Sequence, residues 1–213
     1  LTANQIKSLT AEQAGAIEAA DLPAMNREAV AALSAEQLTG MKALLSKFTT
    51  AQVPALKPAA LETLDSSLFA ELKSEQLAAL KLAQLAAMTT EQVAALATGA
   101  IPGLTNQQIA ALSVGESGQL RALTPTQIAK MASTQIGALT SNQIKALNAE
   151  QAAAIEAADL PAMTKDAVTA LSAEQLTGMK ALLSKFTTSQ VPALKATELA
   201  KMDSSLFSEL VSG

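Results

Sequence analysis

The residues of this chain that could carry out chemistry are few. Cys, His, Trp and Tyr are absent from its 213 residues, which removes thiolate nucleophiles, imidazole bases and most ligands of zinc and haem iron. The carboxylates are scattered rather than grouped as a calcium site requires, and no residues form the pattern of a catalytic triad. We therefore expect no enzymatic activity and no catalytic, cofactor-binding or metal-binding residues.

The motif that comes closest to a site is DSSLF, which occurs twice, beginning at Asp65 and at Asp203. Asp is a common helix N-cap residue, because its carboxylate accepts a hydrogen bond from the first turn. Both Asp residues stand at such a position, and Phe69 and Phe207 stand where the repeat described below places an inward apolar side chain. We expect these residues to cap and pack rather than to bind a ligand.

The elements that position these residues follow from a repeat of eight residues. A Leu, Ile, Met or Phe opens each unit, and most units carry a second apolar residue at position six. The units MKALLSK at 41 and 179 have seven residues, and the unit LSVGESGQLRA at 112 has eleven. The units begin at residues 1, 9, 17, 25, 33, 41, 48, 56, 64, 72, 80, 88, 96, 104, 112, 123, 131, 139, 147, 155, 163, 171, 179, 186, 194, 202 and 210.

A longer repeat lies above the short one, because residues 1–72 recur at residues 139–210 with few changes. We interpret residues 1–213 as a single repeat array. The pattern is under way at the first residue and stops part-way through a unit at the last, so we expect a fragment of a longer protein. Residues 96–122 contain several Gly and the longest unit, and we interpret them as an irregular segment that re-phases the array.

Each unit has the pattern of one short helix. A continuous helix turns by about 100° per residue, so an apolar stripe of period eight would wrap around it. Thr or Ser at position two and Gln at position five, as in Thr124 and Gln127, have the spacing of a capping box. Helices this short are not stable alone. We therefore predict an all-α solenoid or superhelix of very short capped helices, one per eight-residue repeat, with positions one and six turned inward.

The positions of the prolines support these helix boundaries. Pro58 and Pro125 stand at position three, the first residue of the expected helix, where Pro is tolerated. The other prolines stand at position seven, where we expect them to end the helix at the preceding residue. These are Pro23, Pro54, Pro102, Pro161 and Pro192.

Several other residue types have structural interpretations. All methionines stand at position one, so we expect them to fill the core rather than to bind haem. The glutamines at position five could stack as ladders between turns, although capping already accounts for them. We expect the lysines at 42, 47, 180 and 185 to form a solvated face. The methionines are Met25, Met41, Met88, Met131, Met163, Met179 and Met202.

The unit beginning at residue 112 is unusual because it contains two glycines. Gly115 and Gly118 have neither the lysine nor the spacing of a phosphate-binding loop. We interpret this unit as a bulge in the array, with a binding loop as the alternative.

The charge of the chain argues against binding to nucleic acid, and its distribution of apolar residues argues against a membrane span. With 15 basic and 19 acidic residues the formal net charge is −4, too small and of the wrong sign for binding nucleic acid through its phosphates. No run of about 18 apolar residues is present, so we expect no membrane span in this segment. We also expect no cofactor.

Units such as LTPTQIAK, LTSNQIKA, LTNQQIAA and MTTEQVAA resemble the LTxxQ repeats of very large bacterial secreted or cell-surface proteins, often labelled adhesins or haem-utilisation proteins. The resemblance covers nearly the whole chain and implies architecture and an extracellular or cell-surface location more than an activity. We expect a structural stalk, spacer or filament-forming segment, and the alternative is a solenoid binding scaffold for a protein, peptide or glycan partner. Because a solenoid exposes apolar end turns, we also expect head-to-tail or lateral self-association.

Overall fold

The protein is all-helical in the part of the chain that the structure describes. The computed structural model describes residues 1–41 and 45–204. Each repeat from Leu1 to Leu194 contains one short helical element, and no β-strand occurs in these described ranges. The expected all-α class, with one helix per repeat, is confirmed. The chain divides into two compact units, Leu1–Leu104 and Thr105–Gly213.

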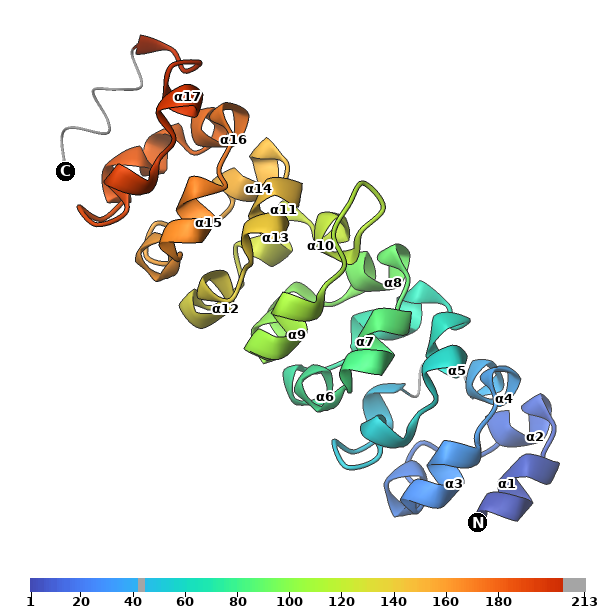
Figure 1. The fold of residues 1–213 in the computed structure, drawn as a ribbon. Coiled ribbons are helices and arrows are strands. Elements are labelled where there is room, and N and C mark those ends of the chain that lie inside the picture. Colours follow the sequence, from blue (N-terminus) through green and yellow to red (C-terminus); the bar gives the residue numbers. More distant parts are fainter. Residues whose placement is uncertain (42–44, 205–213) are drawn as a thin grey trace. The chain divides into compact units, whose positions relative to one another are not determined.

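The first unit contains eight α-helices and five 3₁₀ helices among its described residues (Figure 1). The α-helices are α1 (Ala3–Ser8), α2 (Ala11–Gly15), α3 (Arg27–Ala32), α4 (Ala35–Gly40), α5 (Pro58–Glu62), α6 (Ser74–Ala79), α7 (Leu82–Ala87) and α8 (Thr90–Ala95). The 3₁₀ helices are η1 (Leu22–Ala24), η2 (Leu45–Lys47), η3 (Val53–Ala55), η4 (Ser66–Glu71) and η5 (Thr98–Gly103).

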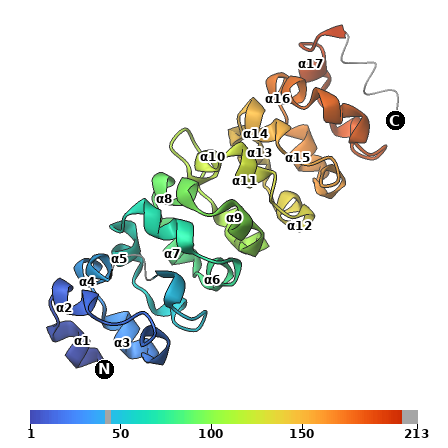
Figure 2. The ribbon, with the colours of Figure 1, turned by 180° about the vertical axis from the view of Figure 1, so that it is seen from behind.

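The second unit contains nine α-helices and three 3₁₀ helices among its described residues (Figure 2). The α-helices are α9 (Asn106–Ala111), α10 (Gln119–Ala122), α11 (Pro125–Ile128), α12 (Ser133–Gly137), α13 (Ser141–Ala146), α14 (Ala149–Ala153), α15 (Lys165–Thr169), α16 (Ala173–Gly178) and α17 (Ala196–Leu199). The 3₁₀ helices are η6 (Leu160–Ala162), η7 (Lys180–Lys185) and η8 (Val191–Ala193).

The α-helices begin where the capping motif predicts. In α8 the Thr89 hydroxyl accepts a hydrogen bond from the backbone N–H of Gln92 at 3.2 Å, and the Gln92 side chain accepts one from the N–H of Thr89 at 3.0 Å. This is the reciprocal capping box. The helix then runs from position three to position eight of its repeat and ends at the next inward residue, Leu96.

The prolines at position seven do not act as expected. Pro58 and Pro125 are the first residues of α5 and α11, as predicted. The five prolines at position seven instead lie inside 3₁₀ helices, namely η1, η3, η5, η6 and η8. An α-helix beginning at position three would need an N–H at position seven to donate to the carbonyl of position three. Proline lacks that N–H, so these repeats form a 3₁₀ helix in place of the α-helix instead of ending it early.

The core is built from positions one and six, as the pattern predicted. In the repeat that begins at Leu80, for example, Leu80 is 6% exposed and Leu85 is 1% exposed. Within each unit, helices three repeats apart pack against each other, such as α2 on α4, α5 on α7 and α14 on α16. Figure 1 shows α1 beside α3 and α2 beside α4. Each short helix is therefore stabilised by a later part of the chain.

Candidate functional site

Glutamine is the characteristic buried polar residue of this fold. Apart from Asp159, every polar or charged side chain that is buried in the described residues is a glutamine, at position five of its repeat except for Gln119 in the eleven-residue repeat. They are Gln37, Gln52, Gln76, Gln84, Gln92, Gln108, Gln119, Gln127, Gln135, Gln143, Gln151, Gln175 and Gln190, and each is at most 4% exposed. Burial of so many amides is favourable only if their hydrogen bonds are made.

Gln84 shows how one such amide is used. Its Oε1 accepts the backbone N–H of Lys81 at 2.8 Å, at the start of its own helix α7. Its Nε2 donates to the carbonyl oxygens of Val53 and Leu56, both at 2.8 Å. These carbonyls belong to position six of a repeat four units earlier and to position one of the repeat that follows it. We call this arrangement a glutamine clamp.

Nine glutamine clamps are described in full, and their Nε2–carbonyl distances range from 2.7 to 3.3 Å. They are Gln37, Gln52, Gln76, Gln84 and Gln92 in the first unit and Gln143, Gln151, Gln175 and Gln190 in the second. The sequence predicted their capping role and left a ladder between turns open. The structure shows capping together with bonds between repeats, although these run from side chain to backbone and not from glutamine to glutamine.

The clamp suits glutamine because of the groups that short helices leave unpaired. The first N–H groups and the last carbonyls of a helix have no partner inside it. The amide carries one acceptor oxygen and two donor hydrogens, and these match one N–H at the start of a helix and two carbonyls near the end of another. No buried side-chain nitrogen or oxygen lacks a partner among the described residues.

The register of the clamps is counted in repeats rather than in residues. Where all intervening repeats have eight residues, the Nε2 acceptors lie 31 and 28 residues earlier, as for Gln84. Across the seven-residue repeat that begins at residue 41, the acceptors of Gln52 lie 30 and 27 residues earlier. Across the eleven-residue repeat that begins at residue 112, the acceptors of Gln143 lie 34 and 31 residues earlier. In every case the acceptors begin four repeats earlier.

The extra residues at 112–122 therefore leave the register unchanged, which differs from the re-phasing that we expected. The Ser113 hydroxyl accepts the backbone N–H of Gln119 at 3.0 Å, the bond that a capping box makes across three residues but which here spans six. The residues between them form a loop in which Gly115 has a φ of 117° and Val114 is 47% exposed. Only glycine adopts such a φ readily, so Gly115 allows the insertion to leave the helix stack.

Two repeats of the second unit carry an acid in place of the clamp glutamine. Asp159 accepts a hydrogen bond from the Ser133 hydroxyl, three repeats earlier. Glu198 accepts a hydrogen bond from Lys201 at 2.9 Å and the backbone N–H of Ala173, also three repeats earlier, at 3.0 Å. The hydrogen bond from Lys201, followed by that from Ala173, lowers the pKa of Glu198. Acids at position five thus also join repeats, but through donors on the earlier repeat.

The DSSLF motif behaves as a cap and a core contact where the structure describes it. The carboxylate of Asp65 accepts the Ser67 hydroxyl at 2.5 Å and the Ser67 backbone N–H at 2.9 Å, and both bonds lower its pKa. Phe69 is 1% exposed. Asp203 is exposed, and Phe207 lies outside the described residues.

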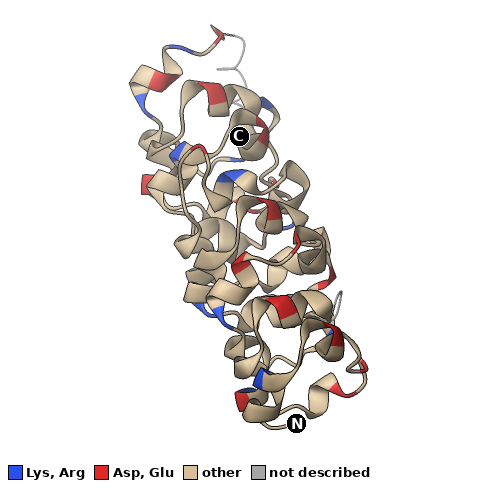
Figure 3. Cartoon of the chain, turned by 90° about the vertical axis from the view of Figure 1, so that its right-hand side faces the viewer, with Lys and Arg blue, Asp and Glu red and all other residues tan. Residues whose placement is uncertain are grey.

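The other residues singled out in the sequence also have structural places. All seven methionines are buried, as expected of core residues. Lys47, Lys180 and Lys185 are exposed, and Lys42 lies outside the described residues. In Figure 3 basic and acidic residues are interspersed along the chain. Gly118 is buried at the base of the loop, where an added Cβ would lie 2.6 Å from the Ser113 carbonyl oxygen.

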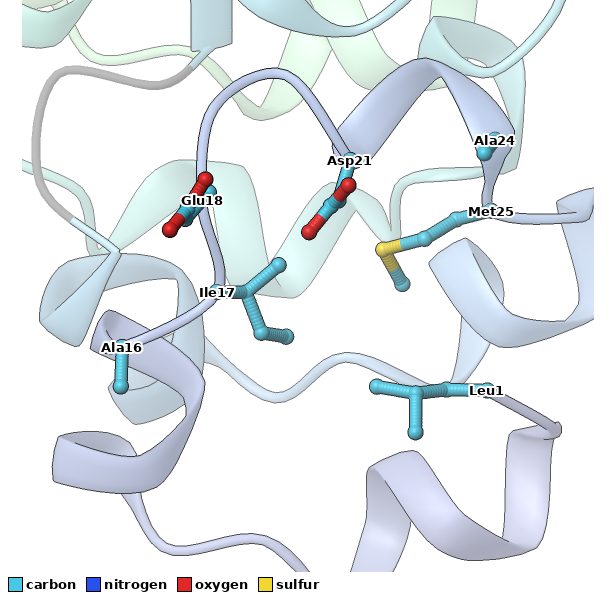
Figure 4. Close-up of a pocket in the computed structure, with 7 residues that line it drawn as sticks. All are labelled: Leu1, Ala16, Ile17, Glu18, Asp21, Ala24 and Met25. Carbon is cyan, nitrogen blue, oxygen red and sulfur yellow. The ribbon is translucent and has the colours of Figure 1, made fainter.

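An apolar hollow lies at the edge of the first unit. It has a volume of about 480 Å³, and Figure 4 shows Leu1, Ile17 and Met25 extending into it beside the carboxylates of Glu18 and Asp21. Leu1 is 61% exposed, although position one is an inward position in the repeats that follow.

In the described part of the chain, no group of three or more Asp or Glu residues comes together as metal ligands would. No helix in that part is long and apolar enough to cross a membrane.

Comparison with known proteins agrees with a repeat region. The ALTTAQ repeat family matches residues 116–149. Within this segment ALTPTQ at 122–127 and ALTSNQ at 138–143 share the first three letters and the final Q of that motif. Their final residues, Gln127 and Gln143, are buried, and Gln143 is one of the clamps. No curated protein matches the chain.

Proposed function

We propose that this chain is a non-catalytic structural segment, a stalk, spacer or filament-forming region of a bacterial cell-surface or secreted protein. The observation that carries the proposal is the constant clamp register. Each described clamp ties a repeat to the repeat four units earlier, whether the intervening units have seven, eight or eleven residues. If every repeat is bonded to the repeat four before it, each added repeat lengthens the structure in the same way.

The same register supports a solenoid in each unit. Packing between repeats three apart, together with clamps between repeats four apart, returns the chain over itself once in every few repeats. The buried polar side chains are used in these contacts, which suits a structural role. The secreted or surface location rests on the likeness of the units to LTxxQ repeats.

Self-association is part of this proposal. Gln5 and Gln13 are exposed, and their Oε1 atoms accept only the N–H groups of Thr2 and Thr10 in their own repeats. With the apolar hollow around Ile17, they form an edge that resembles the repeat-to-repeat surfaces buried elsewhere in the unit. We propose that the matching surface of a second copy covers this edge, head to tail.

Sedimentation velocity at several concentrations tests the self-association. Ile17→Glu should shift the chain toward monomer, because it places a charge in the proposed interface. Leu82→Glu is the matched control, since Leu82 is 46% exposed on α7 and lies away from the hollow. A wild-type chain that stays monomeric at every concentration would rule this part out.

The spacer role is tested by changing the length of the array. A variant with a second copy of residues 1–138 inserted in register adds whole repeats. Small-angle scattering and electron microscopy should show a longer particle with the same cross-section. A particle that grows equally in all directions would contradict the spacer and the solenoid.

A further inference from the structure

The residues that make contacts between repeats are separated by few residues in the sequence, throughout the described chain. The side-chain hydrogen bonds that join different repeats connect residues 24 to 34 positions apart, from Thr169 with Ala193 to Gln143 with Ile109. The extensively packed helix pairs are neighbours or lie three repeats apart. Tension applied to the two ends of a unit must therefore pass from one repeat to the next.

Each repeat is held by a small set of contacts that act together. These are its two inward apolar side chains and, in the nine repeats where a clamp is described, one glutamine clamp. The α-helices have four to six residues, which is far below the length at which an isolated helix is stable in water. A repeat that is pulled off its neighbour will therefore lose its helix, and its eight residues can extend to roughly 28 Å.

Refolding of a released repeat is also favoured, because its contacts join residues that are close in the sequence. The entropy cost of closing a loop grows with its length, and chains with local contacts fold quickly. A released repeat has to find carbonyls only about 30 residues away on an array that is still folded, as Gln52 does with Leu22.

We propose that the array is an extensible tether, which lengthens under tension by releasing a few repeats at a time and recoils when the tension falls. This inference rests on the spacer role and adds a mechanical property to it. The remainder of the array stays folded during extension, because release of one repeat removes contacts only from its neighbours and from repeats three and four away.

Single-molecule stretching of the whole chain in optical tweezers tests the proposal. The chain has no Cys, so one cysteine appended at each end gives unique attachment points for handles. We expect several steps, each the length of a few repeats, and relaxation curves that retrace the extension. One abrupt release of the full length, with a relaxation at much lower force, would overturn the tether. If that chain still grew in length with added repeats, the spacer role would stand.

A pair of variants shows whether the clamps carry the load. Gln84→Met removes a cap and a clamp, whereas Gln13→Met removes a similar cap from an exposed glutamine without inter-repeat bonds among those described. Both variants are first checked for wild-type helical content by circular dichroism. We expect Gln84→Met to let the first steps occur at lower force, with Gln13→Met close to wild type. Equal step forces in the two variants would also overturn the proposal.

Discussion

A glutamine side chain has one acceptor and two donors, and the clamp uses all of them. The oxygen of Gln175 accepts the N–H of Ser172, and its nitrogen donates to the carbonyls of Ile144 and Leu147, both at 2.7 Å. Glutamate would lose the donors, and asparagine is one methylene shorter. The chemistry of a single residue type thus joins the beginning of one helix to the end of another.

We expect Gln84→Met to reduce the free energy of unfolding by about 3 kcal/mol, because it removes the cap on the Lys81 N–H and the side-chain donor of the carbonyls of Val53 and Leu56. Gln13→Met should cost about 1 kcal/mol or less, the value of a helix cap. Urea denaturation of the two variants measures the difference. Similar losses would mean that the bonds between repeats contribute little.

The capping role of the clamp glutamine could be predicted from the sequence, but its bonds to another repeat could not. Thr or Ser three residues before Gln predicts the cap, since both groups lie in one helical turn. The acceptors of Gln84 lie 31 and 28 residues earlier, and no local spacing marks a backbone carbonyl as a partner. Burial of the amide would have indicated these bonds. That burial depends on a repeat that packs nearby, and the position of this repeat could not be predicted from the sequence.

Among the helices, close approach depends on glycine at particular places. An added Cβ on Gly103, at the end of η5, would lie 2.1 Å from the backbone oxygen of Ser74 in α6. Gly99 lies in the same 3₁₀ helix with no atom within 4 Å of such a Cβ. The two glycines therefore separate the effect of packing from the effect of backbone freedom.

We expect Gly103→Ala to lower the free energy of unfolding by about 2 kcal/mol, because α6 and η5 must move apart. Gly99→Ala should be neutral or stabilising by up to about 1 kcal/mol, since it restricts the unfolded chain without a clash. Thermal unfolding of both variants gives the comparison. A stable Gly103→Ala protein would show that this contact yields easily.

The loop between Ser113 and Gln119 lies outside the register of the clamps, so it should be removable. Removal of residues 114–116 would leave LSSGQLRA, in which Ser and Gln regain the ordinary capping spacing. We expect the deletion variant to melt at the wild-type temperature or a few degrees higher, since a shorter loop costs less entropy to close. Circular dichroism checks the transition. A large loss of stability would mean that the loop itself makes contacts the array needs.

The kind of helix was harder to predict than its position. The repeat located one helical element in every described unit, because inward residues and caps recur at fixed positions. The sequence did not predict 3₁₀ geometry at Pro23 or Pro161, because a proline at position seven is compatible with an early helix end as well as with a different helix.

On the scale of the whole molecule, the core is shared between repeats rather than enclosed in one place. Leu139 is 2% exposed and opens the repeat of α13, which packs against α10 and α15. Damage at one inward residue should therefore spread to the repeats three units before and after it. The near-duplicate blocks 1–72 and 139–210 do not mark the division into units after Leu104, so sequence identity alone did not predict that division.

We expect Leu139→Asp to lower the free energy of unfolding by at least about 3 kcal/mol, because a charge replaces a buried side chain. Hydrogen exchange should accelerate in α10, α13 and α15, the helices that share this core. Leu82→Asp, at a residue that is 46% exposed, is the control. Faster exchange confined to α13 would contradict a shared core.

A register counted in repeats also has a genetic consequence. Residues 1–72 recur after 138 residues, a distance that comprises 17 complete repeats. Unequal recombination between such copies inserts or removes whole repeats, so each glutamine downstream of the junction still finds carbonyls beginning four repeats earlier. Genes of this kind can therefore change the length of their product in one event without passing through a misfolded intermediate, and selection can act on length alone.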